Sequence, residues 1–408
     1  MRWLPFSILS VCLLGASAAS AETVLVLPFF NESGFRSIDW IGESISETIH
    51  DSLSSRDVLV LSREERLEGC RRLSIRPNAI LTHASIIKLS EALDASHVIY
   101  GRYEIIHSPD SAAASAGPVA PTASVSPHDS LRLAVRILDL QHTRLGPESE
   151  EIGALEDLGR LETNLAWQCL KQLAPDRTPS EDDFRRNRPT VRLDAIENYV
   201  RGLIAPTPEQ RHRLFTQAAR LDPRFSEPSF ELGKLEFEKK DYAIAAGWLE
   251  KVAPAAPSYF EATFLLGLCR YQTGDFAGAV KSFDTVAGPF PLNEVFNDLG
   301  AAQLRLGANG ALDNFHHAAD GDSADPDYQF NLGYALWKRG DFATAADSFR
   351  SLLDRSPEDT EAVVFLGRCL KKEGPRAGDP RSEGRERLKW NFEGNAYRQL
   401  KAALESKH

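Results

Sequence analysis

The first part of the chain alternates between short apolar runs and segments with apolar residues at helical spacing. Residues 23–29 (TVLVLPF) form a continuous apolar run that is typical of a buried strand. Ile41, Ile45 and Ile49 indicate a helix over 39–55, with Asp39 as its N-cap. Further strands are predicted at 57–63, 97–105 and 130–140, and further helices at 63–73, 83–96 and 158–173. The order βαβ(α)αβββα predicts an α/β domain with a mixed sheet over residues 22–173.

From residue 191 the pattern becomes a repeat. Leu-Gly pairs recur at intervals of 33 or 34 residues and end at Gly233, Gly267, Gly300, Gly333 and Gly367. Seven residues later four units carry a second glycine (Gly274, Gly307, Gly340, Gly374), and a small Ala, an aromatic or Leu, and a Pro follow in most units. The first glycine allows two helices to approach closely, and the second ends the first helix in a left-handed conformation. Such a helical hairpin must stack on its neighbours to bury its apolar face.

This repeat resembles the tetratricopeptide repeat (TPR) in its spacing and residue types. The resemblance implies an all-α superhelical solenoid over residues 191–374, with about six repeats, the first degenerate and ending at Pro223. The unit at 293–325 is irregular, because Ala308 and Asn309 replace an Asp-aromatic pair. Residues 375–408 are expected to form a loop and a C-terminal helix, over 385–404 (RERLKWNFEGNAYRQLKAAL), that caps the stack.

The first domain is similar to the N-terminal domain of the TolB translocation proteins and to FlgO and CsgG-type envelope proteins. The similarity lies in VLVLPFFNESG (24–34), IGESISETIHDSL (41–53), VLVLSREE (58–65), ASHVIYGRYE (95–104) and RLAVRILDLQHTRL (132–145). It implies a domain that docks to envelope machinery or oligomerises. No β-propeller follows, so the resemblance does not imply the full activity of TolB.

Three further segments stand out by their composition. Arg2, an apolar run to Leu14 and Ala19-Ser20-Ala21 are typical of a signal peptide, which predicts cleavage after residue 21 and a periplasmic or secreted protein. A buried N-terminal strand is the alternative, and bulky Val11 before Cys12 disfavours a lipoprotein. Residues 108–129 are rich in Ala, Ser and Pro and predict a flexible insertion. Residues 174–190 are charged and contain prolines, which predicts a linker.

Charge and cysteine content narrow the class of protein. The formal net charge is −11, and removal of Arg2 with the signal peptide makes it −12, which disfavours nucleic-acid binding. No later apolar run is long enough for an integral membrane span. None of the four cysteines of the mature chain lies in a CxxC pattern, so no zinc site is expected. Cys70 and Cys169 either pair with each other or remain packed free thiols.

Motifs for catalysis are absent from the sequence. It contains no Walker A loop, dinucleotide fingerprint or HExxH motif, and the segment IGESIS (41–46) lacks the second glycine of a nucleophile elbow. His316 and His317 are adjacent, so they point about 100° apart on a helix and cannot share one metal as an i, i+4 pair can. The acidic run 181–183 is expected to be solvated. We therefore predict no catalytic residues, no metal, no cofactor and no enzyme activity.

The TPR resemblance places the partner-binding residues on the concave face of the solenoid. These are Phe230, Phe237, Phe264, Tyr271, Arg305, Phe330, Tyr334, Trp337, Lys338, Arg368 and Lys371, within a wider set that includes Lys234, Leu268, Asn297, Leu304 and Lys372. Aromatic residues dominate early in this set and basic residues late, so apolar anchors and an acidic partner segment are expected. The alternative is that the aromatic residues only pack within the repeats.

These observations predict an exported, non-catalytic adaptor or scaffold of the bacterial cell envelope that binds a partner segment in the groove of its solenoid. The alternative is a structural accessory subunit of an outer-membrane or secretion assembly that oligomerises through the α/β domain. A third hypothesis, an envelope enzyme or ligand-binding protein that uses the α/β cleft, is disfavoured by the absence of catalytic motifs. The oligomeric state, monomer or ring, distinguishes the first two hypotheses.

Overall fold

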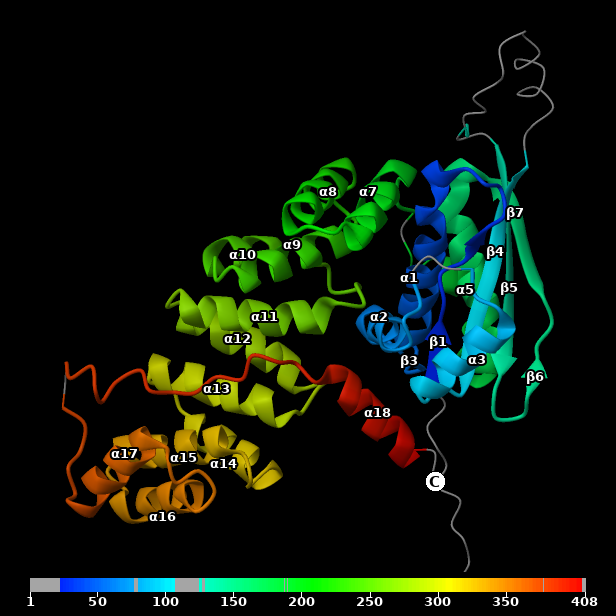
Figure 1. Cartoon of the computed structure of the whole chain (residues 1–408). Helices are drawn as coiled ribbons and strands as arrows, with labels where there is room; N and C mark the ends of the chain where they lie inside the picture. The colour runs from blue at the N-terminus through cyan, green and yellow to red at the C-terminus, as the bar shows by residue number, and fades with distance from the viewer. Residues whose placement is uncertain are drawn as a thin grey trace, which may run out of the picture.

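The chain folds into an α/β region followed by a long stack of helices, which confirms the expected fold class (Figure 1). This computed structural model describes residues 23–76, 80–106, 125–126, 129–186, 188, 190–376 and 378–405. The predicted signal peptide and most of the predicted insertion 108–129 lie outside the described residues, so both stay predictions.

A mixed sheet forms the centre of the α/β domain, with seven strands among the residues that the structure describes. The strands are β1 (Thr23–Val26), β2 (Phe30–Asn31), β3 (Leu59–Val60), β4 (His97–Ile106), β5 (Ser130–Asp139), β6 (Arg144–Leu145) and β7 (Ser149–Ala154). The main order is β3-β1-β4-β5-β6, with β2 beside β4 and β7 beside β5. β1 is parallel to β3 and β4, whereas β4 and β5 form a long antiparallel pair from His97↔Asp139 to Ile106↔Ser130.

Helices cover both faces of this sheet, which explains why β1 is apolar at successive positions. α1 (Trp40–Ser54) and α5 (Leu158–Leu173) bury Val24 and Val26 on one face. α2 (Arg63–Arg72) and α3 (His83–Ala92) bury Leu25 on the other. Short 3-10 helices, η1 (Arg36–Ile38) and η2 (Leu155–Asp157), precede α1 and α5. Cys70 and Cys169 are buried free thiols in the clusters on opposite faces, so they do not pair.

The segment between the domains packs on the α/β domain. It contains η3 (Pro175–Arg177) and α6 (Glu181–Arg186). Phe184 is only 2% exposed, whereas Asp182 and Asp183 on the same helix are exposed. Ile196 and Val200 of the next helix join the apolar core of α1 and α5, so the solenoid begins in close contact with the α/β domain.

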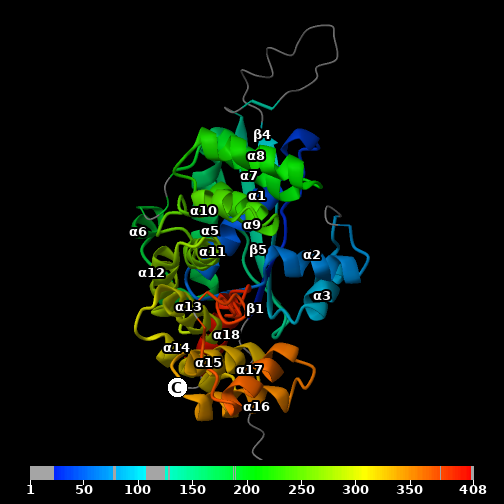
Figure 2. The ribbon, with the colours of Figure 1, turned by 90° about the vertical axis from the view of Figure 1, so that its left-hand side faces the viewer.

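The solenoid is built from helical hairpins stacked in sequence order (Figures 1 and 2). Its helices are α7 (Leu193–Ile204), α8 (Pro208–Leu221), α9 (Glu227–Glu238), α10 (Tyr242–Leu249), α11 (Tyr259–Gln272), α12 (Phe276–Ala287), α13 (Asn293–Leu306), α14 (Ala311–Gly321), α15 (Pro326–Lys338), α16 (Phe342–Leu353) and α17 (Thr360–Leu370). A Cβ atom added at Gly267 would lie 2.7 Å from the Phe283 ring, which confirms the close helix contact expected there. Gly274 has φ +85°, the left-handed conformation expected after a first helix.

The C-terminal region differs from the expected helix over 385–404. A helix forms only as α18 (Gly394–Glu405), and the preceding residues are extended along the solenoid (red in Figure 1). The reason is the spacing of Leu388, Trp390 and Phe392, which alternate with polar residues and so suit a strand-like chain with one buried side.

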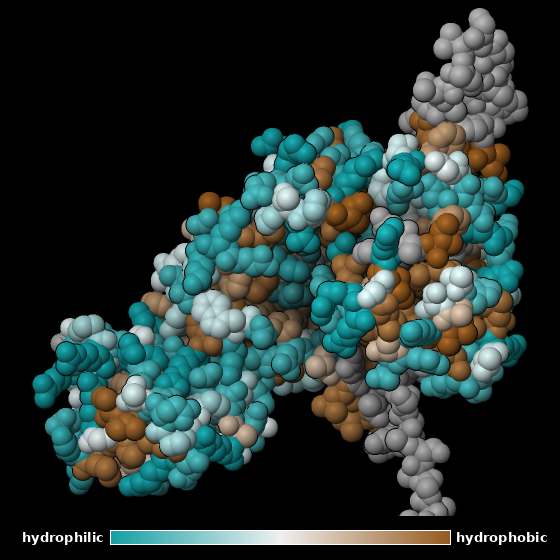
Figure 3. All heavy atoms as spheres, viewed as in Figure 1, coloured by the Kyte–Doolittle hydropathy of each residue, from teal (hydrophilic) through white to brown (hydrophobic). Residues whose placement is uncertain are grey.

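The position of α18 also differs from the expected cap. Its Tyr397 ring lies 5.7 Å from the Phe290 ring, and the helix lies between the solenoid and the α/β domain near β3 (Figures 1 and 2). At the end of the stack Val363 and Val364 of α17 each remain 52% exposed. Hydrophobic residues also gather on the surface at this end of the solenoid (lower left in Figure 3). The expected cap is thus replaced by contacts of the C-terminal region with the middle of the solenoid.

Candidate functional site

An extended part of the C-terminal region occupies the concave face of the solenoid. We call residues 381–393 the tail segment, and we call the face formed by α9, α11, α13, α15 and α17, the first helices of the hairpins, the groove. The tail segment runs opposite to the direction of α15, since Ser382, Arg387 and Lys389 contact Tyr334, Asn331 and Asp327 in that order.

Two buried amide side chains bind the main chain of the tail segment at Arg387. Asn331 Nδ2 donates to the Arg387 carbonyl at 2.7 Å, and Asn331 Oδ1 accepts from the Arg387 N–H at 2.8 Å. Asn297 Nδ2 donates to the same carbonyl at 2.9 Å. Both asparagines are 0% exposed. The pair therefore acts as the neighbouring strand would, and it recognises an extended chain whatever side chain that residue carries.

Further groove side chains bind the main chain on both sides of this amide pair. These contacts are Asp298 Oδ1 with the Lys389 N–H at 2.9 Å, Glu294 Oε1 with the Glu393 N–H at 3.0 Å, Tyr334 Oη with the Ser382 carbonyl at 3.0 Å, and Arg368 Nη1 with the Arg381 carbonyl at 3.1 Å. The groove thus satisfies backbone groups at several positions between Arg381 and Glu393, as buried backbone requires.

Basic side chains of the tail segment face carboxylates at the starts of α15 and α17. Arg387 forms a bidentate pair with Asp359, with distances of 2.7 and 3.0 Å. Its hydrogen bonds hold the pKa of Asp359 below the usual range. Lys389 Nζ lies 2.7 Å from Asp325 Oδ2 and 2.8 Å from Asp327 Oδ2. Arg385 pairs with Glu361. We call Asp325, Asp327, Asp359 and Glu361 the acidic ladder.

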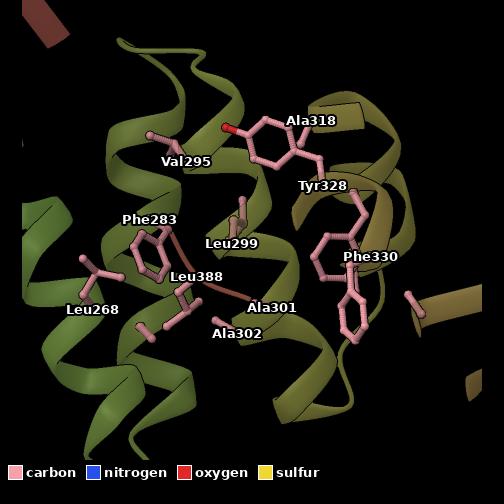
Figure 4. Packing of buried hydrophobic residues seen from close by; sticks show 14 of the residues in the cluster. Leu268, Phe283, Val295, Leu299, Ala301, Ala302, Ala318, Tyr328, Phe330 and Leu388 are labelled. Atoms are coloured by element: carbon pink, nitrogen blue, oxygen red, sulfur yellow. The ribbon is translucent and has the colours of Figure 1, made fainter. Parts of the chain in front are cut away.

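Alternate side chains of the tail segment point into the groove. Leu388 belongs to the buried core and points toward α11–α13 (Figure 4). Trp390, which remains 44% exposed, lies at the rim with its ring centroid 5.8 Å from that of Phe237, and Phe392 lies 5.4 Å from Phe264. Together they cover part of the aromatic surface that would otherwise face solvent.

Glu386 is the one charged side chain on this inward-facing side of residues 386–392. Its side chain is 0% exposed, and its Oε2 accepts a hydrogen bond of 3.0 Å from the Tyr271 hydroxyl and lies 3.8 Å from Arg305 Nη1. Burial raises its pKa, which Arg305 and Tyr271 only partly offset. Keeping Glu386 ionised at this buried position therefore costs free energy.

The predicted groove residues fall into two sets. Those that contact the tail segment are Phe237, Phe264, Tyr271, Arg305, Phe330, Tyr334 and Arg368. Of the others, Phe230 is buried beneath Lys234, Trp337 Nε1 donates to the Glu373 carbonyl, Lys338 lies over the Tyr334 ring, and Lys371 is exposed. That any of them binds a partner stays a prediction.

Sequence reasoning placed Asn297 on the groove but missed Asn331 and the carboxylates that hold the tail segment, although the repeat contains a signal for them. The pairs Asn297/Asn331, Asp325/Asp359 and Asp327/Glu361 are each separated by 34 residues, which is one repeat length. Polar residues that recur at the repeat interval near the start of the first helix indicate a ladder along the groove, because equivalent positions of stacked hairpins lie side by side.

The helical part of the chain matches a known repeat family. Residues 212–260, 255–294 and 309–374 match the model of the tetratricopeptide repeat. These segments cover most of the helical stack, so the stack is a TPR solenoid. Repeats of this class form extended concave surfaces that bind other proteins and are generally non-catalytic.

Solved structures with similar regions are also TPR proteins. Residues 41 to the end of MamA from Desulfovibrio magneticus RS-1 share 22% identity, with 39% of this chain and 92% of that chain covered, at a TM-score of 0.36. YrrB, described as a TPR protein with an unusual peptide-binding site, shares 16% identity over 47% and 97%, at 0.34. TTC0263, a TPR protein from Thermus thermophilus, shares 15% identity over 43% and 99%, at 0.31.

No curated protein matches the chain. The resemblance of the first domain to TolB, FlgO and CsgG-type proteins is not confirmed by these matches and stays a prediction.

The described part of the chain holds no group of three or more His, Cys, Asp or Glu placed to bind a metal ion. His317 stacks on the Phe296 ring, with a centroid distance of 3.8 Å, so it packs on the neighbouring first helix. Across the same described ranges, none of the helices is both long and apolar enough to cross a membrane.

A cavity of about 370 Å³ lies between the α/β domain and the start of the solenoid, and sequence reasoning missed it too. Burial raises the pKa of Glu47, Glu162 and Glu227, which line it, to about 7. Glu162 is 1% exposed, and its Oε1 has no hydrogen-bond partner among the described residues. The cavity thus brings three buried carboxylates to the contact between the two domains.

Proposed function

We propose that this protein is an exported, non-catalytic interaction scaffold of the bacterial cell envelope, and that its groove binds an extended segment of a partner protein. The observation that carries the proposal is the way Asn297 and Asn331 bind main-chain atoms of an extended segment. Helix packing does not need two fully buried amides there, because apolar residues would fill the same space without a desolvation penalty. Buried amides in a groove suit the recognition of a backbone.

The envelope location rests on the predicted signal peptide and on the resemblance of the α/β domain to envelope domains. In this proposal the α/β domain docks the protein to envelope machinery, while the solenoid presents the groove. The apolar contact of Ile196 and Val200 with α1 and α5 fixes the first hairpin on the α/β domain, which suits a scaffold that holds its partner at a set position.

Site-specific photo-crosslinking in envelope extracts tests this function. A photoreactive residue replaces Lys338, at the groove, and a matched control replaces Lys281, which is exposed on the second helix α12. We expect a partner protein that crosslinks from position 338 and not from 281, with the crosslink mapped to one short segment of that partner. If crosslinks form only from residues of the α/β domain, and the protein assembles into rings, the result would instead support an accessory subunit that oligomerises through this domain.

Mass spectrometry of the mature chain tests the export. We expect an N-terminus at Glu22, and a chain that retains Met1 would contradict the envelope location.

A further inference from the structure

We propose that the tail segment is a built-in ligand that closes the groove, and that the partner displacing it is an extended segment in which basic residues alternate with apolar or aromatic ones. This inference rests on the proposed function of the groove. It adds what the groove selects and what controls its access.

Occupancy by the tail segment excludes a second ligand at the central site. Asn331 uses both its Oδ1 and its Nδ2 on Arg387, and Asn297 Nδ2 binds the same carbonyl. Leu388 fills the core position beneath them. A partner that uses the amide pair must therefore replace the tail segment.

The contacts of the tail segment define the chemistry of that partner. The acidic ladder holds Arg385, Arg387 and Lys389, which are two residues apart and so lie on one side of an extended chain. Arg387 also stacks on Phe330, with the guanidinium carbon 3.7 Å from the ring centroid. The opposite side of the chain presents Leu388, Trp390 and Phe392 to the groove.

This pattern changes the expected partner from an acidic segment to a largely basic one. Arg305 and Arg368, which were expected to attract acidic side chains, do face carboxylates of the C-terminal region, Glu386 at 3.8 Å and Asp379 at 4.0 Å. The bidentate and shorter pairs, however, are those of the acidic ladder. Charge selection is therefore strongest for cations at alternate positions.

Two features make the tail segment displaceable. Glu386 Oε1 and Asp298 Oδ2 are buried without a hydrogen-bond partner among the described residues, so the tail segment fits its own groove imperfectly. A hollow of about 770 Å³ also remains beside it, lined in part by Tyr271, Arg305 and Trp390. An incoming segment can begin to bind in this hollow before the tail segment leaves.

The tether between α17 and the tail segment sets the strength of this closure. Residues 371–380 contain no helix or strand in their described part. A tether of about this length gives an effective concentration on the order of 1 mM. A free segment with a dissociation constant of about 10 μM for the open groove would then bind the closed protein about 100-fold more weakly.

The experiment measures binding of a fluorescent peptide with the sequence of residues 380–393 to the full mature chain by anisotropy. One protein carries a protease site after Gly378, which is exposed, so that cleavage removes the tether and leaves every groove side chain native. A second protein carries Arg387→Ala and Lys389→Ala. The matched control carries Arg376→Ala and Lys401→Ala, which remove the same charge at exposed positions.

We expect the peptide to bind the cleaved protein and the double variant about 100-fold more tightly than the intact or control protein. A peptide with Arg387→Glu and Lys389→Glu should bind at least tenfold more weakly than the native peptide, and one with Glu386→Gln more tightly, because it removes a buried charge. Should the double variant fail to fold, the cleaved protein alone decides. A cleaved tail that never exchanges with the peptide in a folded protein would overturn the proposal and make residues 381–393 a permanent part of the core.

Three further outcomes test closure within one chain and separate this inference from the function on which it rests. Concentration-dependent dimers that lose their tail–groove contact on dilution would show exchange of tails between copies, and would overturn closure within one chain. An envelope partner that crosslinks from position 338 equally in intact and cleaved protein would support the scaffold function and would refute closure of the groove by the tail segment. Peptide exchange with no crosslinked partner would support closure of the groove by the tail segment and would refute the proposed scaffold function.

Discussion

The α/β domain and the solenoid stabilise their cores by contacts of different range. In the sheet, β1 pairs with β3 and β4, and β4 pairs with β5, so each strand depends on segments far away in sequence. In the solenoid each helix packs mainly on the preceding and following helices. Damage to the sheet should therefore spread through its whole domain, and damage to a hairpin should stay local.

The tail segment is the exception to locality in the solenoid. It contacts α9 through Trp390, α13 and α15 through Arg387, and α17 through Arg381. It therefore links hairpins that otherwise contact only the hairpins next to them. The following variants test where each kind of coupling begins and ends.

The largest effect is expected for Gly101→Ala in β4. The added Cβ would lie 2.2 Å from the Ala134 carbonyl oxygen and 2.3 Å from the Phe29 ring, so the paired strands would have to separate. We expect a loss of about 3 kcal/mol or more in the stability of the α/β domain. Hydrogen exchange should increase across all of its strands while the helices from α9 onward stay protected. Increased exchange confined to β4 would contradict the long-range coupling.

Gly267→Leu should cost about 3 kcal/mol or somewhat less, and should act locally. The side chain would push into the Phe283 ring, and so separate α11 from α12. Gly333→Leu should act in the same way against Phe349. The control is Gly247→Leu, at an exposed position where an added Cβ meets nothing within 4 Å. Residues 23–173 should melt unchanged in all three proteins, and a shift in that transition would show that the domains unfold as one unit.

Glu162→Gln tests the contact between the two regions. The folded-state pKa of Glu162 is raised from 4.5 to about 7, so its contribution to stability is present below pH 4.5 and is lost as the pH rises through 7. The neutral isostere avoids this loss, so at pH 8 it should stabilise the protein by up to about 3 kcal/mol, and at pH 4 by little. Chemical denaturation at both pH values measures the difference. Glu209→Gln, at an exposed position on α8, is the control and should show no such gain.

Asn331→Ala should have the smallest effect on stability and the most specific one. It removes both side-chain contacts with the Arg387 backbone, a loss of about 1–2 kcal/mol. Hydrogen exchange at the Arg387 amide should accelerate roughly tenfold or more, whereas exchange in α12 should not change. The control is Asn309→Ala, at an exposed position after α13. Equal acceleration in both regions would mean that Asn331 stabilises the repeat rather than the tail segment.

The elements of the fold follow closely from sequence because their signals are local and periodic. The apolar run at 23–29, the spacing of Ile41, Ile45 and Ile49, and the recurring Leu-Gly pairs each correspond to an observed element. The position of residues 385–393 could not be obtained in the same way. The alternation of Leu388, Trp390 and Phe392 is compatible with an extended chain, but it is too short to show on which surface that chain lies. Their position depends on the shape and charge of the groove, which is tertiary context.

The candidate site was predictable in its location but only partly in its chemistry. Phe237, Phe264 and Tyr271 lie where the repeat pattern predicts. The acidic ladder was missed because Asp325 and Asp359 stand just before their helices, where a carboxylate is usually explained as an N-cap. These two residues do cap α15 and α17, and they also bind Lys389 and Arg387. The sequence pattern around each of these residues indicates only the N-cap role and not the contact with the tail segment.

The position of the tail segment after the groove helices in the chain also sets an order of events during synthesis. The last helix that lines the groove, α17, ends at Leu370, so residues 381–393 emerge from the ribosome after all the groove helices. At typical elongation rates of about 5–20 residues per second, the groove is exposed and open for on the order of a second before its own ligand arrives. A nascent chain arrested before Arg381 emerges should therefore capture the labelled peptide, while the completed chain should not. During this interval a partner that is present can bind the open groove. A partner that arrives later must first displace the tail segment.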